Sequence, residues 1–145
     1  MADQEMPMMT FDHAGLSVGD LERSHRFYAD VLGFHITEDT FSLPQFEIRG
    51  RVLRNDAGVR IELFERQGAR PGRPGHPADS ALVHGWFQVA LRVADARATF
   101  DHVVAAGATP VMAPRVAPDG RAIFAFIADP DGTLIEFLQR PDDAG

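Results

Sequence analysis

The sequence predicts an α+β fold in which two βαβββ modules form a curved mixed sheet around a cleft. The first observation is an internal repeat, because residues 58–66 (GVRIELFER) and 132–140 (GTLIEFLQR) share a glycine, an Ile-Glu pair and a final arginine. The second is that residues 13–20 (HAGLSVGD) match residues 88–95 (QVALRVAD). The third is that strand and helix patterns follow in the same order after each of these segments.

These repeats define the expected domain boundaries. We expect a disordered tail, a first module, a Pro/Gly-rich linker or lid, a second module and a short final tail, at residues 1–8, 9–66, 67–85, 86–140 and 141–145. The linker is assigned because residues 68–77 contain too many prolines and glycines for regular structure.

In the first module, residues 11–18 alternate in polarity, as a strand with one buried face does. Asp20 is the expected N-cap of a helix that Gly33 ends. A short strand is expected at residues 34–39. A hairpin then follows, with strands at residues 46–54 and 59–65 joined by a turn at residues 55–58.

The second module repeats this order. Residues 86–93 predict a strand, and Asp95 is the expected N-cap of a helix that Gly107 ends. A short strand is expected at residues 109–113, and the second hairpin has its strands at residues 121–128 and 133–138. Residues 129–132 (DPDG) are interpreted only as the turn of that hairpin.

Composition excludes several classes of function. The chain has no cysteine, which excludes disulfides, thiolate ligands and a cysteine nucleophile. It has no lysine, which excludes Schiff-base chemistry through a lysine. A net charge of −7 argues against nucleic acid or an anionic membrane as partner. The first residues lack an apolar signal segment, so a cytoplasmic location is expected. Modules of this size have small cores, which favours a homodimer. The expected partner is a small-molecule substrate or ligand.

Four side chains are candidate metal ligands. Strand alternation puts His13 and Glu62 on the faces opposite the helix-packing residues, and Gln88 and Glu136 occupy the same places in the second module. An imidazole, two carboxylates and an amide oxygen suit one divalent ion such as Zn, Ni, Co, Mn or Fe. His84 is a competing candidate for the fourth ligand.

Two segments carry a resemblance to a known family. Residues 11–34 (FDHAGLSVGDLERSHRFYADVLGF) resemble the opening of the vicinal oxygen chelate superfamily, and residues 129–137 (DPDGTLIEF) resemble its ending. The resemblance covers about residues 9–140 and implies a glyoxalase-like fold. It also implies that His13, Glu62, Gln88 and Glu136 are the metal ligands.

The resemblance leaves more than one function open. The first hypothesis is a metal-dependent lyase, isomerase or epimerase of the glyoxalase type. Under this hypothesis Glu136, or else Glu62, removes a proton from the carbon α to a carbonyl, and the metal stabilises the resulting enediolate. The second is a metal-free protein of the bleomycin-resistance type that binds an antibiotic or metabolite. An extradiol dioxygenase is disfavoured, because Gln88 stands where those enzymes have a second histidine.

A further set of side chains is expected to contact the substrate. Aromatic side chains would form walls of the cleft, and arginines would attract an anionic group. The residues are Phe46, Arg60, Phe64, Trp86, Arg70 and Arg73.

Overall fold

The computed structural model describes residues 5–72 and 75–143. The expected tails at residues 1–8 and 141–145 lie partly outside these ranges, and Arg73 lies outside them entirely. Within the described residues, no helix is long and apolar enough to cross a membrane.

The first module has the predicted order of elements. A strand is followed by a helical segment whose last turn is a π-helix, and then by three strands and a short 3-10 turn. They are β1 (Ala14–Val18), α1 (Leu21–Arg26), η1 (Phe27–Val31), β2 (Ile36–Leu43), η2 (Pro44–Phe46), β3 (Ile48–Arg54) and β4 (Arg60–Arg66).

The second module follows the same plan after one short helix in the linker. Its elements are α2 (Pro77–Ser80), β5 (Gln88–Arg92), α3 (Ala96–Ala105), β6 (Thr109–Val116), β7 (Ile123–Ala128), β8 (Leu134–Gln139) and η3 (Pro141–Asp143). Two short elements were not expected, α2 and η3, because the sequence predicts a linker or lid at residues 67–85 and a tail at residues 141–145.

Local signals explain where the helices begin and end. Asp20 accepts a hydrogen bond from the Arg23 amide, and Asp95 accepts one from the Ala98 amide, so both aspartates cap helices as predicted. Both helical segments end at a glycine with positive φ, a conformation that side chains with a Cβ rarely adopt. The predicted helix at residues 20–33 is therefore present, although its second half is a π-helix.

Strand order confirms that the chain is a duplicated α+β fold. The sheets have the orders β1-β4-β3-β2 and β5-β8-β7-β6, with the first pair parallel and the others antiparallel in both. Glu62 lies opposite Gly15, two residues after His13, and Glu136 lies opposite Ala90, two residues after Gln88. The four candidate ligands thus occupy equivalent register positions, as the repeat predicts.

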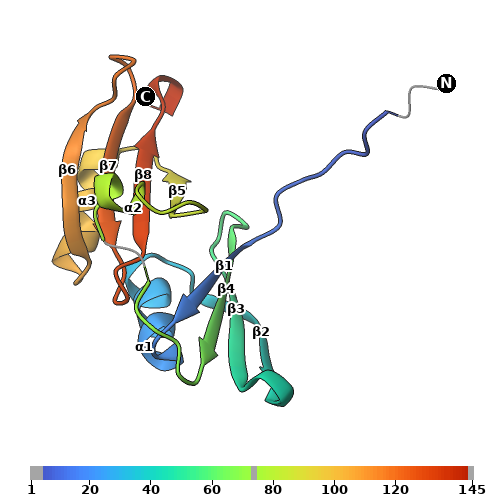
Figure 1. Ribbon diagram of the computed structural model, residues 1–145. Helices are drawn as coiled ribbons and strands as arrows, with labels where there is room; N and C mark the ends of the chain where they lie inside the picture. Colours follow the sequence, from blue (N-terminus) through green and yellow to red (C-terminus); the bar gives the residue numbers. More distant parts are fainter. Residues whose placement is uncertain (1–4, 73–74, 144–145) are drawn as a thin grey trace.

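The two sheets are separate within the chain and share one apolar core. Figure 1 shows β1–β4 at the lower right and β5–β8 at the upper left. Buried residues of both modules belong to a single cluster, which includes Leu16 and Leu63 from the first module and Ile135 and Phe137 from the second. We call the opposite faces of the sheets, where the candidate ligands lie, the site faces.

Candidate metal and substrate site

His13 and Glu62 form one half of the candidate site. His13 Nε2 lies 2.7 Å from Glu62 Oε2, so the imidazole and the carboxylate contact each other on the site face of the first sheet. The other ring nitrogen, Nδ1, lies 2.7 Å from Asp12 Oδ2. The hydrogen bond to Asp12, together with the negative charge of Glu62, raises the pKa of the His13 imidazole. Sequence reasoning did not identify Asp12, although it precedes the histidine directly.

Gln88 and Glu136 form the other half. The Gln88 side-chain amide donates a 2.8 Å hydrogen bond to Glu136 Oε2, on the site face of the second sheet. Burial raises the pKa of the Glu136 carboxyl, and this outweighs the opposing effects of Arg140 and Gln88. A carboxylate with a raised pKa is a stronger base, which is the property that proton abstraction requires.

The two pairs do not meet within one chain. Among the described residues, no group of three or more histidine, aspartate or glutamate side chains is close enough to hold a metal ion. Each pair supplies donor atoms that suit a divalent cation, but a site with all four ligands needs both pairs together. The candidate ligands of one chain therefore form two separate pairs, and we call each pair a candidate half-site.

A large groove separates the half-sites. It has a volume of about 1560 Å³ and lies between β1 and β5, the edge strands of the two sheets. His13 and Gln88 both line it. The linker contributes residues 69–72 and Ser80 to its wall, and the turn at residues 130–133 contributes another part.

The predicted substrate-binding residues fall into three groups. Arg60, Arg70 and Trp86 line the groove, and the Trp86 side chain is 96% exposed at its rim. The Phe64 ring packs edge-on against Phe41, with ring centres 5.6 Å apart. Phe46 is exposed in η2 and does not line the groove in the described chain.

Arg60 is held in place by another charged group. Its guanidinium donates to Glu38 at 2.7 and 3.2 Å, and Arg54 donates to the same carboxylate at 2.6 Å. Glu38 belongs to the bulge of β2, where the register with β3 shifts between Thr37 and Asp39. The expected role of Arg60 toward a substrate anion therefore competes with this ion pair.

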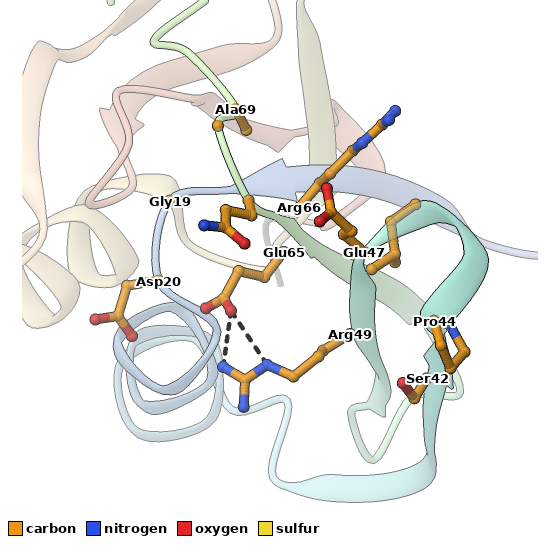
Figure 2. Close-up of a pocket in the computed structure, with 12 residues that line it drawn as sticks. Gly19, Asp20, Ser42, Pro44, Glu47, Arg49, Glu65, Arg66 and Ala69 are labelled. Carbon is orange, nitrogen blue, oxygen red and sulfur yellow. Dashed lines mark hydrogen bonds and ion pairs between the residues drawn. The ribbon is translucent and has the colours of Figure 1, made fainter.

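A second cavity, of about 560 Å³, lies at the end of the first sheet and contains none of the candidate ligands (Figure 2). Glu65 and Arg49 form an ion pair across it at 2.7 Å, and Glu65 also accepts a hydrogen bond from the Leu21 amide. Glu65 is thus already engaged by Arg49 and by the first backbone amide of α1.

Comparison with known proteins identifies the family. The model of the Glyoxalase/Bleomycin resistance protein/Dioxygenase superfamily matches residues 10–137. The chain belongs to this superfamily. The resemblance found in the two sequence segments is confirmed, and the duplicated fold agrees with it.

Several members of the superfamily are similar over nearly the whole chain. A lactoylglutathione lyase of Haemophilus influenzae is 33% identical over 130 residues, which cover 88% of this chain and 90% of the relative. A probable lactoylglutathione lyase of Vibrio cholerae is 32% identical, with 88% of each chain covered. The crystal structure of a glyoxalase family protein from Enterococcus faecalis superposes with a TM-score of 0.74 at 20% identity, covering 95% of this chain and 99% of the other. That last comparison supports the fold alone.

Proposed function

We propose that this protein is a metal-dependent lyase or isomerase of the glyoxalase type, which moves a proton on a carbon α to a carbonyl. The observation that carries the proposal is the pairing of His13 with Glu62 and of Gln88 with Glu136 at equivalent register positions. The names of the similar superfamily members agree with this class of reaction.

The four side chains would hold one divalent ion such as Zn, Ni, Co, Mn or Fe. A bound ion would supply Lewis acidity toward two adjacent oxygens of the substrate. The protein's own part is to present one imidazole nitrogen, two carboxylates and one amide from fixed strands. Strand positions hold such groups with little reorganisation.

Glu136 is the proposed base. It is half-buried beside its cross-strand neighbour Phe126, and burial raises the pKa of its carboxyl. The Gln88 amide donates to the carboxylate and orients it. Glu62, which faces His13, is the second candidate for the same step.

We also propose that two copies of the chain complete the site. In the described chain β1 pairs with β4 and β5 pairs with β8, so each edge strand has one side without a partner strand. If β1 of one copy lies beside β5 of another, His13 and Glu62 of the first copy meet Gln88 and Glu136 of the second. Because a sheet edge without a neighbouring strand is prone to associate with another strand, such an arrangement also covers both edges.

A mixing experiment tests the shared site. The Glu62→Ala and Glu136→Ala variants are each inactive if both carboxylates are needed. Refolding or co-expressing the two together restores activity only if a site combines modules of different chains, because one site of the mixed dimer is then intact. No recovery, with a mixed dimer verified by mass, would show that each chain builds its own site.

The compound in the relatives' names provides the first activity assay. Lactoylglutathione formation from methylglyoxal and glutathione would be followed by thioester absorbance, before and after removal of metal with a chelator. Activity that is lost with the metal and restored by Zn²⁺, Ni²⁺ or Co²⁺ supports the proposal. A protein purified without a His-tag that contains no metal, and whose melting no metal shifts, contradicts it.

A second candidate is a metal-free protein that binds a small molecule. It is favoured by two edge-on aromatic pairs near the site faces, Phe41 with Phe64 and Phe124 with Phe126. Under this hypothesis ligand affinity would not respond to a chelator. The extradiol dioxygenase remains disfavoured, since Gln88 takes the place of a histidine.

A further inference from the structure

Asp12 and Glu62 hold His13 from opposite sides. Asp12 Oδ2 lies 2.7 Å from Nδ1 of the imidazole, and Glu62 Oε2 lies 2.7 Å from Nε2. The Asp12 side chain is 78% exposed, whereas that of Glu62 is 20% exposed. The two carboxylates therefore lie in different surroundings. Glu62 lies at Nε2 on the site face, and the more exposed Asp12 lies at Nδ1, on the other side of the imidazole.

The position of Glu62 beside Nε2 selects the nitrogen that a metal shared with Glu62 would bind. A neutral imidazole carries one proton, and only the nitrogen without it has a lone pair to donate. A metal held together with Glu62 would take Nε2, so the proton must be on Nδ1. An acceptor at Nδ1 stabilises this tautomer and fixes the plane of the ring.

We propose that Asp12 is a positioning residue for His13, which it holds in the Nδ1–H tautomer with Nε2 directed at the site. This inference rests on the proposed function, since it assigns His13 to a metal. Asp12 touches neither metal nor substrate in this arrangement, and it acts only through the imidazole.

The chain offers a matched control in another exposed Asp–His pair. His35 Nε2 lies 2.8 Å from Asp56 Oδ1, and both side chains are more than half exposed. Asp56→Ala removes the same kind of carboxylate from an imidazole that is not a candidate ligand. Any general effect of losing an exposed negative charge should be the same in both variants.

The first measurement is metal affinity of the full chain, by competition with a chromophoric chelator for Zn²⁺ and, in a parallel series, Ni²⁺. Asp12→Ala should weaken binding by about 10- to 100-fold, the usual effect of losing an outer-shell partner of a ligating histidine. Asp12→Asn keeps an oxygen acceptor for Nδ1–H and should recover part of this loss. Asp56→Ala should bind as the wild type does. Equal affinity in Asp12→Ala and the wild type would overturn the proposal.

The second measurement does not need a metal. Nitrogen-15 NMR of the metal-free protein at about pH 9, well above the ordinary histidine pKa of about 6.5, reports the tautomer of each neutral imidazole. Asp12→Ala should move His13 toward the Nε2–H tautomer, and Asp56→Ala should leave His13 unchanged. If the wild type binds neither ion, the proposed function fails, and the tautomer measurement alone tests the role of Asp12. An unchanged His13 tautomer in Asp12→Ala would then refute that role.

Discussion

The Tyr28 hydroxyl donates a 2.7 Å hydrogen bond to Asp129 Oδ2, and both side chains are buried. Tyr28 belongs to the helical segment of the first module and Asp129 to the β7–β8 turn of the second, so the bond joins the two modules. The other oxygen of Asp129 accepts from the amides of Asp131 and Thr133, both at 2.9 Å.

Asp131 extends this contact to the start of α1. It accepts hydrogen bonds from the Gly19 amide at 3.1 Å, the Arg23 guanidinium at 2.9 Å and the Ser24 hydroxyl at 3.3 Å. We call these groups the inter-module bracket: Gly19, Arg23, Ser24, Tyr28, Asp129 and Asp131. Because Gly19 follows β1 and the turn leads into β8, the bracket joins the ends of two strands that lie next to the candidate half-sites.

Tyr28→Phe should lower the free energy of unfolding by about 1–3 kcal/mol. The ring still fills its place, but a buried carboxylate oxygen loses its donor. Urea denaturation of Tyr28→Phe, Asp129→Asn and the double variant measures the coupling between them. Additive effects of the two substitutions would show that the hydrogen bond contributes nothing to stability.

The stability of the protein should depend on pH through Asp129. Burial raises the pKa of this carboxyl above its ordinary value of 3.8, despite the opposing hydrogen bonds from Tyr28 and the turn amides. A carboxyl whose pKa is higher in the folded state binds its proton more tightly there, so protonation favours folding. This contribution is complete below the unfolded pKa and is lost as the pH rises through the folded pKa.

The wild type should therefore gain stability relative to Asp129→Asn as the pH falls from neutral toward 3.8, through the raised pKa. Denaturation curves of both proteins across that range measure the difference. If the difference does not change with pH, Asp129 has no raised pKa in the folded protein.

Asp131→Ala should remove the hydrogen bonds that Gly19, Arg23 and Ser24 donate to this carboxylate, without altering either sheet. Losing hydrogen bonds to a charged group is expected to lower the free energy of unfolding by about 1.5–3 kcal/mol. Hydrogen exchange should become faster at the Gly19 amide, which donates to Asp131. Asp56→Ala, in the corresponding turn of the first module, is the control, because it removes only an exposed pair with His35. Equal effects of the two variants would show that the bracket has no special role.

Metal should stabilise the folded protein if the half-sites combine as proposed. An ion that binds only the native state at 100 times its Kd adds about 2.7 kcal/mol. Chelator should lower the Tm and added metal restore it in the wild type. Glu62→Gln and Glu136→Gln should show a much smaller shift, and Glu47→Gln, which removes an exposed glutamate elsewhere, should respond like the wild type. A shift that persists in all three variants would place the metal at another position.

Gly50→Ala should displace Phe41. A Cβ at Gly50 would lie 2.1 Å from the tip of the Phe41 ring, so the ring must move away from Phe64. Loss of that aromatic contact is expected to cost about 0.5–1.5 kcal/mol. Gly15→Ala is the control, because its Cβ would meet the Phe64 ring at an ordinary 3.5 Å. NMR contacts between the two rings and urea denaturation distinguish the variants, and unchanged ring contacts in Gly50→Ala would disprove the clash.

Much of the fold was predictable because its signals are local and occur twice. The repeat around Glu62 and Glu136, the aspartate caps and the terminal glycines gave the duplicated order of strands and helices. The edges of the elements were less accurate: the strand predicted at residues 11–18 begins at Ala14, and the strand predicted at residues 34–39 continues to Leu43. Hydrogen bonds to neighbouring strands set these ends, and the polarity pattern does not contain that information.

The sequence by itself determined which residues are equivalent, since strand alternation and repeat register relate His13 to Gln88 and Glu62 to Glu136. Only the tertiary structure decided which of them meet within one chain. It pairs histidine with glutamate and glutamine with glutamate on two sheets whose edges remain apart. It also shows that residues 129–132 are more than a turn, because Asp129 and Asp131 bind the first helical segment. These contacts join residues more than 100 positions apart, and their strength depends on burial, which no local pattern specifies.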